Sequence, residues 1–187
     1  MSANKEIIDY AIYSEEIEKW LALKGETKYM RFASILNANG IVVKWNVLKD
    51  TYRYDKRLLV NIFKYLSFFE EFLRAQIWNI SQISYNKLEG AFLAEIMNEV
   101  LKFQGEVYYA GFSIDTLEEN RDYINYLRNR VSHNKILLES KKDSCNLQDL
   151  LVKFKLTLPT SYQMGFIKDI NGCTQKLNVP NVIIIKI

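Results

Sequence analysis

Four residue types are scarce in this chain: its 187 residues include one histidine, two cysteines, two prolines and seven glycines. Cys145 and Cys173 are isolated and form no Cys-x-x-Cys pair, which argues against a disulfide framework or a zinc site and fits a reducing cytoplasm. No apolar run approaches the roughly 18 residues of a membrane span, and residues 1–10 lack the apolar core of a signal peptide. We therefore expect a cytoplasmic protein without a membrane partner.

The overall composition is that of a folded domain with a mild excess of positive charge. Hydrophobic residues make up 49% of the chain and charged residues 25%, and the formal net charge is +3. This charge is compatible with a polyanionic partner but does not identify one. Aromatic residues reach 13%. Their rings could stack on bases, although most of them follow the helical spacing of core residues.

The scarcity of proline and glycine favours a mostly helical chain. Apolar residues recur every three or four positions between Lys56 and Ser84, which predicts a long central helix with a core-facing stripe. Four further residues are expected to widen this stripe: Leu58, Phe63, Phe68 and Phe72. Shorter helices are expected from a cap at Ser14 to Gly25, at 27–37 and at 90–103. The segment 41–54 gives no clear pattern.

A second long helix is expected to begin near Ser113, with Asp115 or Thr116 as alternative caps, and to reach about Leu138. Beyond it, residues 141–187 should form a small C-terminal extension. This extension would hold an exposed connection, a helix at 147–154 and a mixed segment between the two prolines. Its end, 182–187, should be a short strand or a packed tail. The fold class is therefore a single mainly α-helical domain, residues 1–187.

The segment RNRVSH, residues 128–133, holds the single histidine near the end of this second helix. Histidine can accept and donate a proton near neutral pH, and arginine can bind a phosphate with several hydrogen-bond donors at once. On a helix, Asn129 and His133 lie one above the other on the face opposite the apolar stripe, and Asn125 and Ser132 share that polar face. Arg128 lies at the edge of the stripe. We therefore expect His133 to face solvent or another molecule, in a site for chemistry on a phosphodiester.

Arg128 has a second possible role in this pattern, since its long side chain could pair with an acid on a neighbouring helix. The candidate acids are Asp55, Glu70 and Glu71. Glu70 and Arg74, four residues apart, have the spacing of an ordinary helix ion pair. The sequence does not choose among these pairings.

The count of histidines adds a constraint on any RNA cleavage at His133. Attack by a ribose 2′-hydroxyl works best with one general base and one general acid. One imidazole cannot fill both roles, whereas two copies related by a two-fold axis can. The sequence thus predicts a homodimer with a composite site.

The chain resembles the HEPN superfamily, whose signature is R-x(4–6)-H with a polar residue often following the arginine, and more narrowly the Abi family of abortive-infection proteins. Arg128, Asn129 and His133 match that signature. The segment YRYDKRLLVNIFKYLSFFEEFLRAQIW is similar to the Abi-type pattern of Asp-x-Arg-Leu, a long apolar helix, an acid and Leu-Arg. These features fall on Asp55, Arg57, Leu58, Glu71 and Arg74. The likeness covers about residues 50–140.

The resemblance implies a helical bundle, often dimeric, that cleaves RNA without a metal or another cofactor. His133 would act as general base or acid, Arg128 would hold the scissile phosphate, and Asn129 would orient either one. Glu71, Arg74, Asn125 and Ser132 would support the site or bind RNA. The products would be a 2′,3′-cyclic phosphate and a 5′-hydroxyl. Many relatives are toxins in phage defence, held in check by a protein or RNA antitoxin.

The chain departs from the family pattern at two positions. Lys135 stands where relatives paired with a nucleotidyltransferase antitoxin often carry tyrosine, which disfavours that antitoxin. Asn134 stands where Abi relatives often carry a further histidine. Two other interpretations stay open: a HEPN-type module that binds RNA or protein without cleaving it, and a structural dimer whose RNRVSH face only forms an interface.

Overall fold

The computed structural model describes residues 15–81, 87–88, 90–103 and 111–187. The predicted cap at Ser14 and the predicted end of the central helix at Ser84 lie outside the described residues. A membrane-crossing helix is absent from the described parts of the chain, where no helical segment joins sufficient length to sufficient apolar character.

The described chain is mainly α-helical, as the sequence predicts. The helices are α1 (Glu15–Lys24), α2 (Glu26–Ala38), α3 (Trp45–Ile80), α5 (Leu93–Leu101), α6 (Ile114–Ser132), α7 (Leu147–Thr157) and α8 (Thr160–Asn171). The short 3₁₀ turns are η3 (Leu137–Glu139), η4 (Gly172–Thr174) and η5 (Asn181–Ile183). A small antiparallel hairpin, β1 (Lys141–Lys142) and β2 (Cys145–Asn146), connects η3 to α7.

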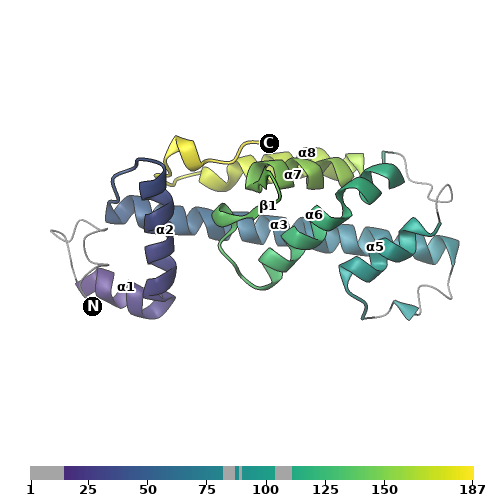
Figure 1. Ribbon diagram of the computed structural model, residues 1–187, viewed down its shortest axis with the longest axis horizontal. Coiled ribbons are helices and arrows are strands. Elements are labelled where there is room, and N and C mark those ends of the chain that lie inside the picture. The colour runs from purple at the N-terminus through teal and green to yellow at the C-terminus, as the bar shows by residue number, and fades with distance from the viewer. Residues whose placement is uncertain (1–14, 82–86, 89, 104–110) are drawn as a thin grey trace.

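Helix α3 runs along the long axis of the molecule, and most of the other helices pack against it (Figure 1). Its 36 residues correspond to a length of about 54 Å. The buried stripe of α3 is Leu48, Thr51, Tyr54, Leu58, Ile62, Leu66, Phe69, Leu73 and Ile77, together with Asp55, Tyr65, Phe72 and Gln76. Helices α2, α5, α6 and α8 all pack on it. The long helix therefore organises the whole domain.

The structure corrects the predicted central helix in three respects. It ends at Ile80, and the next residue, Ser81, has an extended backbone, so the helix stops before the predicted end at Ser84. The helix begins at Trp45, well before Lys56. The sequence pattern misses these first turns because they bury the polar residues Thr51 and Asp55, which a search for apolar periodicity does not register. Phe63 and Phe68 do not widen the buried stripe, because their side chains are 56% and 37% exposed.

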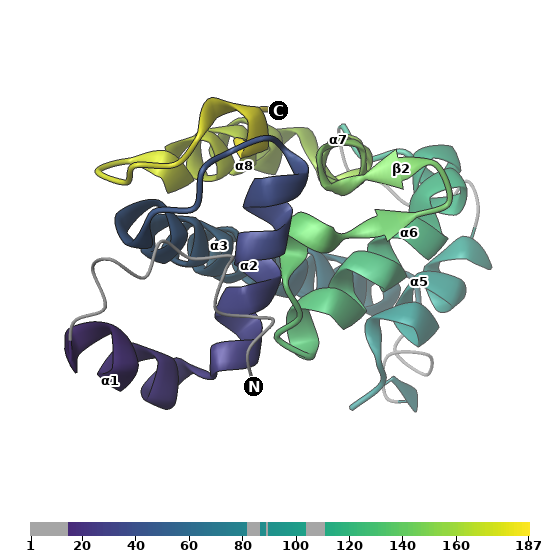
Figure 2. The same cartoon turned by 60° about the vertical axis from the view of Figure 1, so that its left-hand side comes forward.

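Helices α7 and α8 form a layer over α3 and α6, as two views show (Figures 1 and 2). An aromatic cluster holds this layer: Phe154 of α7 meets Phe69 of α3 and Phe166 of α8 edge to face, with ring centroids 5.9 Å and 5.4 Å apart. These three aromatic residues therefore belong to the core.

The segment between Pro159 and Pro180, for which the sequence predicts mixed structure, contains a regular helix, α8. Its buried face has only two members, Phe166 and Ile170, too few to give a helical period in the sequence. The last residues form the packed tail, one of the two predicted alternatives. Ile183 is buried, and the N–H of Ile185 donates to the hydroxyl of Tyr54 at 2.8 Å.

Asp55 ties the chain after α6 to α3. Its carboxylate is fully buried and accepts hydrogen bonds from the backbone N–H groups of Leu137 at 2.7 Å and Leu138 at 3.0 Å. Burial raises the pKa of Asp55 to about 6, although the two amides and the nearby Lys56 and Arg130 favour its charged form. The carboxylate thereby fixes the position of η3.

Two arginines of α3 donate hydrogen bonds to backbone carbonyl oxygens of other loops. Arg57 donates to the carbonyl oxygens of Cys173 at 3.1 Å and Gln175 at 2.6 Å, which anchors η4 and the turn after it. Arg74 donates to the carbonyl oxygens of Leu88 and Ala91, in the segment before α5. Charged residues of α3 thus satisfy backbone groups that the loops cannot pair among themselves.

Replacement of Asp55 by asparagine should flatten the pH dependence of stability in mildly acidic solution. The folded protein binds this proton more tightly than the unfolded chain does, because burial raises the pKa of Asp55. Its contribution to the free energy of unfolding is therefore largest below about pH 4 and falls by up to about 3 kcal/mol as the pH rises to about 6. Asparagine keeps an oxygen acceptor for the two amides but does not titrate.

Urea denaturation of the wild type and Asp55→Asn between about pH 4 and pH 7 measures this difference. Asp55→Ala removes the acceptor as well and should destabilise the fold at every pH, by about 1 to 3 kcal/mol. Parallel stability profiles for the wild type and Asp55→Asn would contradict the assignment.

Candidate functional site

Helix α6 ends in a Schellman turn that depends on one asparagine. Asn134 has a φ of 49°, in the left-handed region that asparagine tolerates better than most residues. Its N–H donates to the carbonyl of Val131 at 3.0 Å, and the N–H of Lys135 donates to the carbonyl of Arg130, also at 3.0 Å. These two bonds satisfy carbonyl groups that the end of the helix would otherwise leave unpaired.

The predicted extension of this helix to Leu138 is therefore wrong, since α6 stops at Ser132. The chain changes direction at Asn134, and the N–H of Leu138 then donates to Asp55 of α3. The predicted start is confirmed: the Ser113 hydroxyl oxygen accepts from the N–H of Thr116 at 3.2 Å. One consequence is that the histidine lies at the tip of the helix, as its C-cap.

The polar face of α6 near this tip is open to solvent. The side chains of Asn129, Ser132 and His133 are exposed, and that of Asn125 is half-buried. Hydrogen bonds from these four side chains to other described residues are not observed. The opposite side of the helix is buried at Leu117, Asn120, Ile124, Leu127 and Val131. The imidazole thus faces outward, as the helical positions predict.

Arg128 turns toward α5 rather than toward the histidine. Its guanidinium carbon lies 5.3 Å from the ring centroid of Phe92, a side chain that is 64% exposed. Within the described residues, no carboxylate lies at ion-pair distance from Arg128. His133 follows Arg128 by five positions, which corresponds to a rise of about 7.5 Å and a rotation of about 140° along a helix. A single chain therefore does not bring these two side chains together.

The predicted supporting residues of α3 have mainly structural contacts. Arg74 donates to the carbonyl oxygens of Leu88 and Ala91, the latter at 2.8 Å, and pairs with Glu70 at 3.0 Å. Glu71 is exposed and lines a shallow apolar hollow with Arg74. Of the three acids considered as partners for Arg128, Asp55 accepts from the backbone of η3 and Glu70 pairs with Arg74. Arg74 positions the segment that carries the aromatic ring beneath Arg128.

Two lysines from other helices converge on the turn that follows His133. Lys56 of α3 donates to the side-chain oxygen of Asn134, and Lys28 of α2 lies 3.5 Å from the carbonyl oxygen of the same residue. Burial lowers the pKa of Lys56, and the charge of Lys28 lowers it further. Neither lysine pairs with a carboxylate in the described part of the chain. Two positive charges therefore lie beside the turn that follows His133.

The sequence identified neither lysine as part of the site. Lys56 stands inside the Asp-x-Arg-Leu pattern, so its neighbours in the sequence contained a signal that could have identified it. Lys28 lies 106 residues from Asn134, and only the tertiary structure brings the two together. The role of Asn134 as a helix stop could have been found, because asparagine commonly follows the last turn of a helix.

The resulting arrangement combines an exposed proton-transfer group, a neighbouring carboxamide and several cations without carboxylate partners. Such a set can bind a phosphate group and transfer a proton beside it. Among the described residues, no cluster of three or more His, Cys, Asp or Glu side chains is placed to hold a metal ion. Comparisons with family models, curated proteins and solved structures find no match to this chain. The geometry of the α6 tip is therefore the main indication of function.

Two substitutions at Asn134 should separate its backbone role from its side-chain role. Both Asn134→Gly and Asn134→Ala remove the oxygen that Lys56 contacts. Only alanine is strained at this positive φ, by about 1 to 2 kcal/mol. We expect Asn134→Gly to be more stable than Asn134→Ala by about that amount in urea denaturation. Equal stability of the two variants would mean that the left-handed turn does not limit the end of α6.

Proposed function

We propose that this protein is a metal-independent endoribonuclease of the HEPN, abortive-infection type, which acts as a homodimer in the cytoplasm. The single imidazole at the exposed tip of α6, with Asn129 one turn before it, is the observation that carries this proposal. The surrounding cations that lack a described carboxylate partner are Lys28, Lys56, Arg128 and Lys135. They match the charge of an RNA backbone.

In the proposed reaction, the 2′-oxygen of a ribose attacks the adjacent phosphorus while the bond from phosphorus to the 5′-oxygen breaks. One imidazole accepts the proton of the 2′-hydroxyl, and a second acidic group gives a proton to the departing 5′-oxygen. Arg128 binds a non-bridging phosphate oxygen and stabilises the charge that develops there. Asn129 orients His133 or the phosphate. The products are a 2′,3′-cyclic phosphate and a 5′-hydroxyl.

The geometry of one chain supports a site shared between two copies. Arg128 and His133 point in different directions around α6, and the chain has no second histidine. The tip of α6 is exposed, so the same face of a second copy can approach it across a two-fold axis. The second copy would then supply the other proton-transfer group. A protein or RNA antitoxin would act by covering this face.

One observation favours a second candidate, a HEPN-type module that binds RNA or a protein without cleaving it. Phe92 is 64% exposed and already stacks with the guanidinium of Arg128. An exposed ring beside a cation is a platform on which a nucleic-acid base can stack. Such a platform needs no catalytic histidine.

Cleavage in the presence of EDTA distinguishes these two candidates. We expect the wild type to cut a structured RNA and to leave cyclic-phosphate and 5′-hydroxyl ends. His133→Ala and Arg128→Ala should each lower the rate by about 10² to 10⁴ while the circular dichroism spectrum stays unchanged. Arg121→Ala is the matched control, since this half-buried arginine of the same helix contacts Asn98 and Asp122 instead.

Three outcomes of that experiment would count against the proposal. Cutting by both His133→Ala and Arg128→Ala at the wild-type rate would show that the site is elsewhere. An equal loss in Arg121→Ala would indicate a general effect of charge. Uncut RNA bound by the wild type and by both variants would support the binding module.

Mixing wild-type and His133→Ala subunits tests the shared site. If each active site needs an imidazole from both subunits, activity should follow the square of the wild-type fraction. An equal mixture after subunit exchange should then keep about one quarter of the activity, against about one half if each chain acts alone. Light scattering measures the oligomeric state of the same samples, and an active monomer would rule out the shared site.

A further inference from the structure

A basic hollow lies between the first half of α3 and the end of α8, next to η4. Its volume is about 700 Å³, within the range of pockets that hold small ligands. Four cations line it against one acid: Lys56, Arg57, Lys168 and Lys176 against Asp169. The hollow therefore has a net positive charge before any ligand enters.

The single acid of the hollow already has partners. Asp169 accepts from the ammonium of Lys64 at 2.8 Å and from the hydroxyl of Tyr65 at 3.0 Å. These hydrogen bonds lower the pKa of Asp169, with the larger effect from Lys64. Lys168 and Lys176 are both exposed, and neither pairs with a carboxylate in the described residues. Their charges are available to an anionic ligand.

The rim of the hollow is held in an unusual backbone conformation. Lys176 has a φ of 60°, in the left-handed region that glycine usually occupies. Arg57 donates to the carbonyl of Gln175, directly before it, and the N–H of Leu177 donates to the carbonyl of Thr174 at 3.0 Å. The fold thus holds Lys176 in a left-handed backbone conformation that is strained for a residue other than glycine.

The hollow is continuous with the tip of α6 through one side chain. Lys56 lines the hollow, and its ammonium donates to Asn134, the residue next to His133. The described lining contains no aromatic side chain, so it offers no surface for stacking bases. Charge without stacking groups suits a sugar–phosphate backbone, whose recognition does not depend on sequence.

We propose that this hollow binds the phosphate backbone of the RNA strand beside the phosphate that His133 acts on. This inference rests on the proposed function and adds the path of the substrate. The strand passes from the α6 tip across Lys56 into the hollow, where Lys168 and Lys176 contact flanking phosphates. These contacts strengthen binding for RNA of any sequence.

Binding of an uncleavable RNA tests the path. The probe is a fluorescent 2′-O-methyl oligonucleotide of about twelve residues, which lacks the hydroxyl needed for cleavage. For the double variant Lys168→Ala/Lys176→Ala, we expect fluorescence anisotropy at low salt to give an affinity about tenfold weaker than that of the wild type. The slope of log affinity against log salt should fall by about 1.4, because each lost single-strand phosphate contact contributes about 0.7.

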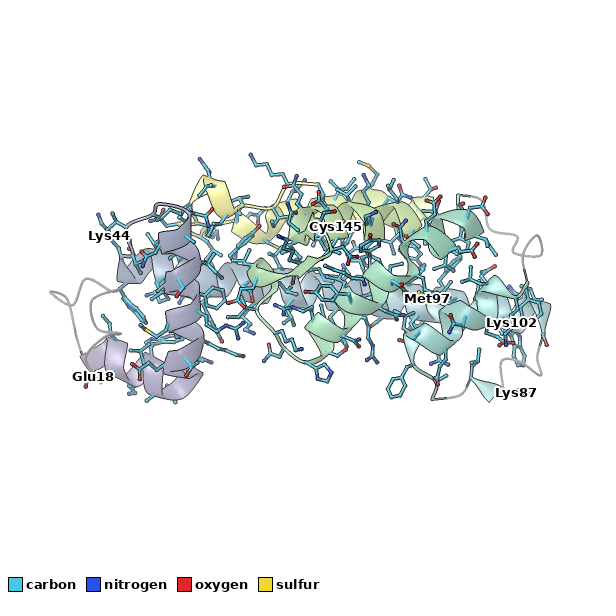
Figure 3. All side chains as sticks on the ribbon, in the orientation of Figure 1. Glu18, Lys44, Lys87, Met97, Lys102 and Cys145 are labelled. Carbon is cyan, nitrogen blue, oxygen red and sulfur yellow. The ribbon has the colours of Figure 1, made fainter. Side chains whose placement is uncertain are left out.

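Lys102→Ala is a control for the loss of one positive charge outside the hollow. Lys44 directly precedes α3, and Lys102 lies at the opposite end of the molecule from it, so Lys102 is far from the first turns of α3 (Figure 3). Among the described contacts, the ammonium of Lys102 pairs only with Glu99, three residues before it. This variant should bind the probe as the wild type does. An equal loss in Lys102→Ala would overturn the hollow as a specific site.

The remaining outcomes separate this inference from the proposed function. Wild-type binding and wild-type salt dependence in the double variant would overturn the hollow even if the protein cleaves RNA. Weaker probe binding in the double variant, together with no cleavage by the wild type, would support the hollow and refute the nuclease. If calorimetry shows that the double variant loses binding of inorganic tripolyphosphate but not of RNA, the hollow takes a free phosphate ligand and the strand path is wrong.

Discussion

A buried carboxylate on the central helix determines where the candidate site lies. Asp55 is fully buried and accepts the N–H groups of Leu137 and Leu138, so the chain after α6 must return to α3. Burial of a carboxylate is unfavourable, and its raised pKa reflects this. The two amides and the charge of Arg130 offset part of that penalty. The Schellman turn at Asn134 ends the helix, and the Asp55 anchor directs the chain that follows back to α3, so His133 lies at the helix tip beside the central helix.

Five of the residues on which the proposed family resemblance rests divide into two groups by what they contact. Asp55, Arg57 and Arg74 all bind backbone groups of distant loops. These contacts give the Abi-like pattern along α3 an architectural explanation that needs no role in catalysis. Arg128 and His133, in contrast, have exposed or partly exposed side chains with no described polar partner. The chemical part of the resemblance therefore depends on α6 alone.

The sequence predicts elements whose signals are local and misses those that depend on contacts between helices. The apolar stripe of α6 and its cap at Ser113 follow from residues within the helix itself. The start of α3 was missed because Asp55 is stabilised by a segment that lies 82 residues away. Helix α8 was missed partly because it contains Gly165, a residue that weakens a helix prediction. A Cβ at that position would lie 2.8 Å from the hydroxyl of Tyr65, so a larger residue there would force the Tyr65 side chain or α8 to shift.

The distribution of charge along α6 limits how a nucleic acid can lie on it. The outward face of its first half carries the exposed acids Asp115, Glu118 and Asp122, which repel a phosphate backbone. Positive charge gathers at the other end, where Lys28 and Lys56 reach the turn after His133. An RNA strand that contacts the imidazole cannot follow the helix toward its N-terminus without meeting these acids. Under the proposed function, the strand crosses the tip instead, where Lys56 of α3 contacts Asn134 and also lines the basic hollow beside α8.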